Sequence, residues 1–146
     1  MKFLQLQYTV IRGCETWTLT KPDRRRIVTF ELWRWRGLLR IPWTARVTNI
    51  EVLERINPEM SLEGEITRLK LTYFGRVMRA SSLEKEMLLG MVSGKRKQGG
   101  PKTRWLDTIK NDTGMNIKRL KEAVMDRRAW RDLAYRASKG RTRLNG

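Results

Sequence analysis

Apolar and polar residues alternate at the beginning of the chain. The alternation runs over residues 4–10 and returns over residues 16–19, after a turn-forming Gly13. A period of two is typical of a β-strand, and two such runs around a glycine predict a hairpin. Two strands alone are marginally stable, so we expect this hairpin to pack on helices or on a partner.

From residue 20 onward the apolar residues recur at helical spacing. Pro22 suits the first turn of a helix, and Thr48 and Glu51 form the pattern of a capping box. Residues of the helix-capping types stand at positions 61, 116 and 126, and Gly114 suits a helix end. Helices are predicted over residues 22–39, 48–56, 61–79, 83–92, 101–113 and 117–125, and from 126 onward.

The predicted helix over residues 61–79 has the clearest amphipathic pattern. Its apolar stripe consists of Leu62, Ile66, Leu69, Tyr73 and Val77. Four cationic residues fall mostly off the stripe, namely Arg68, Lys70, Arg76 and Arg79. Gly64 and Gly75 have low helix propensity and weaken the prediction of a straight helix.

Five of the six tryptophans of the chain fall into two groups. Those predicted to pack in the core, because they recur with other apolar residues at helical spacing, are Trp33, Trp105 and Trp130. Trp35 lies between Arg34 and Arg36, and Trp43 follows a proline in a predicted loop. These last two tryptophans are candidates for stacking on nucleic-acid bases or on arginine.

A composition shift divides the chain. Residues 93–102 contain four cations and three glycines but no large apolar residue. We therefore expect a basic glycine-rich loop over residues 93–104, preceded by the hairpin and amphipathic helices of residues 1–92 and followed by a basic helical segment over residues 105–146. The predicted fold class is mainly α, a small basic helical domain with a short N-terminal β-hairpin.

The charge balance restricts the function. The chain has 32 Lys and Arg against 15 Asp and Glu, a net charge of +17, which points to a polyanionic partner, a membrane surface or a piece of a larger basic protein. No apolar run reaches the length that spans a bilayer, so we expect no membrane partner. The chain has no histidine and one cysteine, Cys14, which excludes tetrahedral zinc sites and histidine-activated nucleophiles. Its aspartates are scattered, so we expect no metal, no cofactor and no enzymatic activity.

The cations are the positive signal, since lysine and arginine bind a phosphate backbone and release its counterions. The glycine-flanked cations of the predicted loop could follow such a backbone, although a solvated loop or a nuclear-import signal has the same composition. In the last helix Arg127, Arg128 and Arg131 are expected opposite an apolar face. The candidate nucleic-acid-binding residues are Arg34, Trp35, Arg36, Trp43, Lys95, Arg96, Lys97, Lys102, Arg104, Arg127, Arg128 and Arg131.

Several blocks of the sequence resemble one family in order. They span residues 13–21, 30–36, 39–46, 61–64, 69–79, 94–107, 124–131 and 138–144. Over residues 12–144 the chain resembles the carboxy-terminal region of the endonuclease–reverse transcriptase polyprotein of LINE-type (non-LTR) retrotransposons.

This resemblance implies a part in target-primed reverse transcription, in which the parent protein is an RNA-directed DNA polymerase with an endonuclease. The family's catalytic residues lie upstream of the matched region, so none carries over to this chain. The resemblance implies a non-catalytic helical tail that binds RNA or DNA, in the nucleus and cytoplasm, next to upstream polymerase domains. The alternative is a non-functional remnant or a host-adopted interaction module with no nucleic-acid role.

Overall fold

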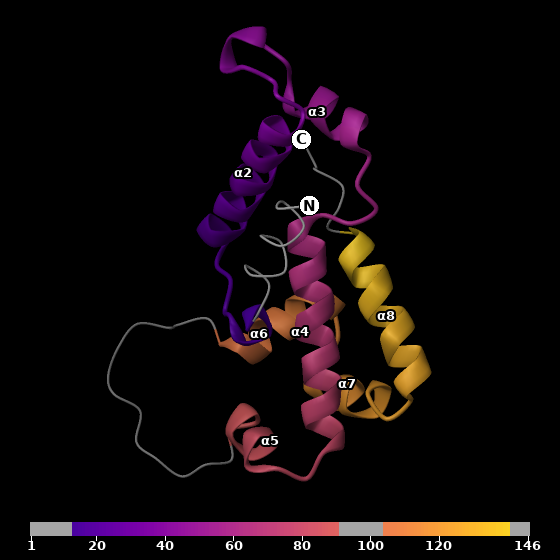
Figure 1. Ribbon diagram of the computed structural model, residues 1–146. Coiled ribbons are helices and arrows are strands. Elements are labelled where there is room, and N and C mark those ends of the chain that lie inside the picture. Colours follow the sequence, from indigo (N-terminus) through magenta and orange to yellow (C-terminus); the bar gives the residue numbers. More distant parts are fainter. Residues whose placement is uncertain (1–12, 91–103, 141–146) are drawn as a thin grey trace, which may run out of the picture.

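The computed structural model describes residues 13–90 and 104–140, and this part of the chain is mainly helical (Figure 1). The helices are α2 (Lys21–Leu38), α3 (Asn49–Ile56), α4 (Leu62–Arg79), α5 (Leu83–Leu88), α6 (Trp105–Thr113), α7 (Ile117–Ala123) and α8 (Arg127–Gly140). Two short 3₁₀ turns, η1 (Cys14–Thr16) and η2 (Trp43–Ala45), precede α2 and α3. The prediction of a mainly helical fold is confirmed, and none of the helices described is long and apolar enough to span a bilayer.

The predicted N-terminal β-hairpin is wrong. The structure contains no strand within residues 13–90 and 104–140, and the first predicted strand, residues 4–10, lies outside the described residues. Just before the expected second strand, η1 buries Cys14 in a small cluster with Leu62 and Ile66 of α4, and Leu19 packs partly buried against this cluster. The indole of Trp105 donates a hydrogen bond to the carbonyl of Glu15 (2.8 Å). Contacts with α4 and α6 therefore hold this segment, whereas Trp17, the other apolar residue of the expected strand, is 42% exposed.

The helix ends follow the local signals in the sequence. Thr48 and Glu51 form the predicted capping box at α3, and a second capping box joins Thr20 and Asp23 at α2. The side chain of Ser61 accepts the Gly64 N–H at the start of α4. These bonds satisfy N–H groups that have no partner within the helix, so they place helix starts close to the predicted residues.

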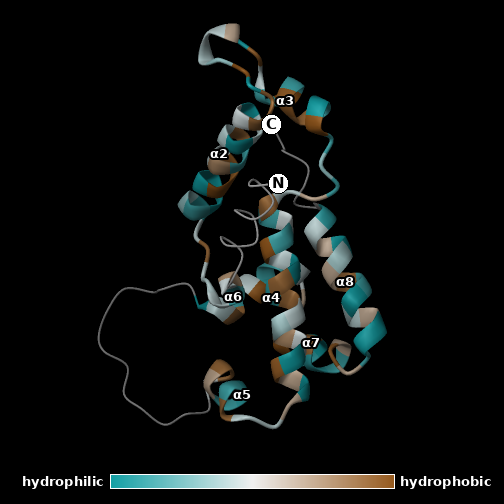
Figure 2. Cartoon of the chain, viewed as in Figure 1, coloured by the Kyte–Doolittle hydropathy of each residue, from teal (hydrophilic) through white to brown (hydrophobic). Residues whose placement is uncertain are grey.

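The core lies around α4, which stands between α2 and α8 in the view of Figure 1. Helix α8 makes the most extensive contact with α4, and α6 and α7 close the cluster. Figure 2 shows hydrophilic residues along much of α8 and hydrophobic residues within α4. The buried cluster consists of Leu71, Phe74, Met78, Ile109, Leu120, Val124, Trp130 and Ala134.

The two glycines of α4 allow α8 to approach closely. A Cβ added at Gly75 would lie 2.5 Å from the indole nitrogen of Trp130, and one added at Gly64 would lie 2.6 Å from the carbonyl oxygen of Ser138. The indole N–H of Trp130 donates to the carbonyl of Leu71 (2.7 Å) between these two contacts. The low helix propensity of both glycines is therefore offset by helix–helix packing.

Burial differs from the sequence-based expectation at two positions, Lys70 of α4 and Trp33 of α2. Lys70, expected off the apolar stripe, is 1% exposed, because α4 is covered on several sides. Trp130 is buried as predicted, and Trp105 packs partly exposed against the core. The prediction for Trp33 is wrong: it is 70% exposed, because α2 turns Glu31, Leu32 and Arg34 inward instead.

Candidate nucleic-acid interface

Helix α8 separates an apolar face from a cationic one. Trp130 and Ala134 are buried against α4, whereas Arg127, Arg128 and Arg131 are exposed. Asp126 begins the helix as predicted, because its carboxylate accepts the backbone N–H groups of residues 128 and 129 (both 3.1 Å). The sequence-based prediction that α8 buries one side and presents these arginines on the other is confirmed. We call Arg127, Arg128 and Arg131 the α8 arginine face.

The end of α4 adds positive charge beside this face. Arg79 of α4 donates a hydrogen bond from Nη1 to the carbonyl of Val124 (2.8 Å), which fixes its guanidinium near the start of α8. Burial and the nearby charges of Arg127 and Arg76 lower the pKa of Arg79. Cations from two helices thus lie close enough to repel one another, and a phosphate group at this position would relieve that repulsion.

The α8 arginine face is not engaged by carboxylates. The ion pairs within residues 13–90 and 104–140 involve the cations Arg24, Arg26 and Arg68, and none of them involves α8. The carboxylate of Asp126, at the start of α8, accepts backbone N–H groups of the helix instead. The exposed guanidinium groups of α8 therefore remain available to an external anion.

Arg34 and Arg36, predicted to bind nucleic acid together with Trp35, make contacts within the protein instead. Arg34 is 5% exposed, and its guanidinium lies 4.3 Å from the centroid of the Trp35 ring. Arg36 donates from Nη2 to the carbonyl of Val47 (2.7 Å) and to Oδ1 of Asn49 (2.9 Å), which holds the loop before α3. Burial removes Arg34 from the surface that a polyanion reaches, and Arg36 is occupied by the loop.

The other predicted residues are distributed over separate places. Trp43, in η2, is 91% exposed, and Arg104 is exposed at the start of α6. The remaining loop cations, Lys95, Arg96, Lys97 and Lys102, lie outside the described residues. The structure therefore brings together Arg127, Arg128 and Arg131 on one face, with Trp43 elsewhere.

Sequence reasoning missed an aromatic surface on α2. Phe30 and Trp33 lie on the outer side of the helix with their ring centroids 6.0 Å apart, and Arg26 is one turn before them. The side chain of Arg26 is 84% exposed. The spacing 26, 30, 33 is the spacing of one helix face and was the signal that could have identified this surface.

The most deeply buried cation is Lys70 of α4. Its Nζ donates to the hydroxyl of Thr108 (2.6 Å), which donates in turn to the carbonyl of Trp105 (2.5 Å). Burial lowers the pKa of Lys70 to about 8 and raises the pKa of the nearby Cys14 thiol to about 11. Both side chains are enclosed, so neither is positioned to react with a ligand from solvent.

A neighbouring ion-pair network joins three helices. Arg24 of α2 contacts Glu63 of α4 (2.8 Å) and Asp112 of α6 (3.2 Å) through different nitrogens. Burial raises the pKa of Glu63, while the charge of Arg24 opposes that rise. Removing one partner would leave buried charge uncompensated, so this network stabilises the arrangement of α2, α4 and α6.

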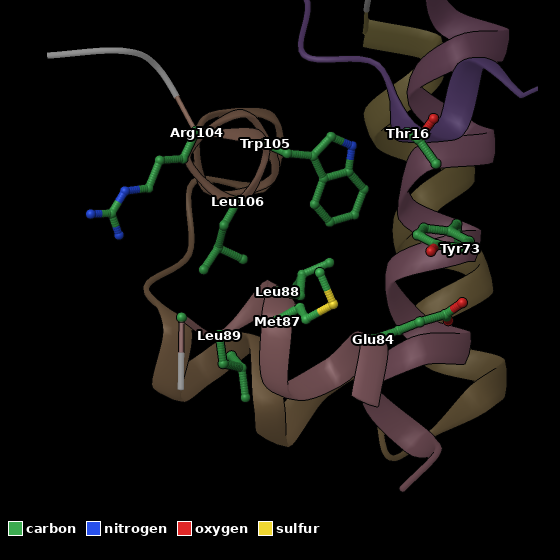
Figure 3. A pocket seen from close by; sticks show the side chains of 10 residues that line it. Thr16, Tyr73, Glu84, Met87, Leu88, Leu89, Arg104, Trp105 and Leu106 are labelled. Atoms are coloured by element: carbon green, nitrogen blue, oxygen red, sulfur yellow. The ribbon is translucent and has the colours of Figure 1, made fainter. Parts of the chain in front are cut away.

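An open cavity of about 470 Å³ lies between α4, α5 and α6 (Figure 3). Trp105, Tyr73 and Leu88 line it, and Figure 3 shows the guanidinium of Arg104 pointing away from it. Burial and the charge of Glu84 raise the pKa of Tyr73, so the phenol stays protonated. The described lining is mostly apolar and its polar groups do not converge on one point, so we place no reaction in this cavity.

The described residues contain no cluster of three or more histidine, cysteine or carboxylate side chains that could hold a metal ion. Comparisons with known protein families, with curated proteins and with solved structures found no match.

Proposed function

We propose that this chain is a non-catalytic nucleic-acid-binding module that holds RNA or DNA through phosphate contacts. The observation that carries the proposal is the α8 arginine face, which is exposed, free of the ion pairs found in the described structure and adjoined by Arg79. The net charge of +17 favours a polyanionic partner over a neutral one. Arginine donates two parallel hydrogen bonds to a phosphate, so this face suits the partner.

The resemblance to the carboxy-terminal region of LINE-type retrotransposon polyproteins supports the same role. In that setting the RNA-directed DNA polymerase and endonuclease activities belong to upstream domains, and this chain holds the template or target. Phosphate contacts carry no sequence information, so binding is expected to be indifferent to base sequence.

The experiment measures affinity for a 20-bp duplex at several salt concentrations. Each phosphate contact contributes about 0.9 to the slope of log K against log salt, so changing Arg127, Arg128 and Arg131 together to Gln should reduce the slope by roughly 2.7. The matched control changes three exposed cations of α2 and α3, Lys21, Arg55 and Arg25, to Gln. Both triple variants lose the same charge, so an equal effect of the two would refute a localised site.

A partner-binding module without a nucleic-acid role is favoured by a different observation. Trp33, Ile50 and Met125 are between 66% and 70% exposed, so a partner that covers them would remove apolar surface from water. On this alternative the isolated chain binds neither duplex nor single strand in low-salt buffer and unfolds without a sharp transition. A monomer with a cooperative thermal transition and salt-dependent affinity would contradict it.

A further inference from the structure

The outer side of α2 carries arginine and aromatic residues in one line. Arg26, Phe30, Trp33 and Gly37 follow one another at spacings of four, three and four residues, which places them on one helix face. Arg40 follows the end of the helix and is exposed, and its φ of 52° takes the chain off the helical path. We call Arg26, Phe30 and Trp33 the α2 aromatic stripe.

The two rings of the stripe are arranged as a surface that a flat ligand can contact. Their planes are tilted by 31°, and the indole of Trp33 is 70% exposed beside the partly exposed Phe30. Gly37 adds no side chain, and even a Cβ built at that position would meet nothing within 4 Å. A helical side chain covers the turn before its own Cα, so the glycine leaves the turn around Trp33 uncovered.

A cation, Arg26, lies one turn before the rings on the same helix face. The Arg26 side chain is 84% exposed, and its closest carboxylate, Asp23 at 4.0 Å, also accepts the Thr20 N–H in the capping box of α2. The stripe therefore favours a ligand that presents flat aromatic groups and negative charge along one direction.

We propose that the α2 aromatic stripe binds single-stranded nucleic acid by stacking unpaired bases on Trp33 and Phe30, with Arg26 on an adjoining phosphate. Bases stack on exposed aromatic side chains irrespective of sequence, and a duplex buries the faces of its bases within its own stack. The inference rests on the proposed function and adds to it a preference for single strands.

A second copy of this chain is a weaker occupant. A stable protein interface needs about 800 Å² from each partner, whereas two aromatic side chains supply at most about 500 Å² even when fully exposed. Each copy also carries a net charge of +17, and the stripe would place arginines of both copies together.

The test compares wild type with Trp33→Ala and Trp33→Leu, using oligo-dT of 20 nucleotides, a 20-mer of abasic sites and a 20-bp duplex. Both variants should weaken oligo-dT binding roughly 5- to 150-fold and leave duplex affinity and the salt slope unchanged. Leucine keeps an apolar side chain but no ring, so it separates stacking from apolar contact. Ile50→Ala, which removes another exposed apolar side chain, should have no effect, and circular dichroism checks that each variant folds.

The outcomes separate this inference from the proposed function. If wild type binds the abasic polymer as tightly as oligo-dT, or if Trp33→Ala weakens duplex binding equally, stacking is refuted while phosphate binding stands. If wild type sediments as a dimer that Trp33→Ala converts to a monomer, the stripe binds a second copy and the inference is overturned. If neither the duplex nor oligo-dT binds at low salt, the proposed function fails, and the inference with it.

Discussion

Replacing Gly75 with alanine tests whether the close approach of α4 and α8 holds the α8 arginine face in place. The added Cβ would lie 2.5 and 2.6 Å from two atoms of the Trp130 indole, where an ordinary contact needs at least 3.4 Å. The indole would have to move by almost 1 Å, yet its N–H is held by the Leu71 carbonyl at 2.7 Å. The substitution therefore forces either a shift of α8 or the loss of this hydrogen bond.

The expected magnitude follows from three contributions. Overpacking a core costs about 1–3 kcal/mol, and a lost hydrogen bond costs about 0.5–1.5 kcal/mol. Alanine recovers about 1 kcal/mol of helix propensity relative to glycine. The net expectation for Gly75→Ala is a destabilisation of about 2 kcal/mol, which lowers the melting temperature by roughly 4–8 °C in a chain of this size.

The matched control is Gly37→Ala, because a Cβ at Gly37 meets nothing within 4 Å. Urea unfolding followed by circular dichroism should show Gly37→Ala as stable as wild type, or up to about 1 kcal/mol more stable, through helix propensity alone. Gly75→Ala should also weaken duplex binding. Equal stabilisation by both alanines would refute the argument that the α4–α8 contact requires a glycine.

Two further predictions concern the interior and a helix end. Burial lowers the pKa of Lys70 from 10.5 to about 8. Between these pH values the native state therefore binds fewer protons than the unfolded state. The free energy of unfolding should then rise by up to about 3 kcal/mol between pH 8 and 10.5. This rise is measured by urea titrations in a Cys14→Ala background, because the raised pKa of the Cys14 thiol lowers the free energy of unfolding between pH 9 and about 11. A Lys70→Met variant should show no such rise. Thr48→Ala removes the cap of α3 and should cost about 1 kcal/mol in the same assay, and a change within error would contradict the capping role.

Helix positions could be predicted well from the sequence, and strands could not. The capping boxes of α2 and α3 and the left-handed Gly114 at the end of α6 depend on bonds between residues at most four apart. The alternation over residues 16–19 predicted a strand, but Trp17 is 42% exposed and only Leu19 packs against a buried cluster. The surface that Leu19 contacts is supplied by a distant element, α4, and its place could not be predicted from the local pattern.

The candidate site was predicted in part. The arginines of α8 were placed correctly because α8 has a clear apolar side, which determines the exposed one. Helix α2 has apolar residues on several sides, so the pattern assigned Trp33 to the core and Trp35 to the surface, and the assignment of Trp33 is wrong. A contact of Glu31 orients α2 in the fold. Its carboxylate accepts the Leu62 N–H at the start of α4 (3.0 Å), which leaves Trp33 on the outer side of α2.

The sequence by itself determined the helix ends, the excess of positive charge and the cationic side of α8. Only the tertiary structure decided that Lys70 is inside, that Arg34 is buried beside Trp35, and that Phe30 and Trp33 form an exposed surface. The physical reason is the distance along the sequence between the residues that interact. Capping bonds and net charge depend on residues close in sequence or on composition alone, whereas burial depends on which distant helices come into contact.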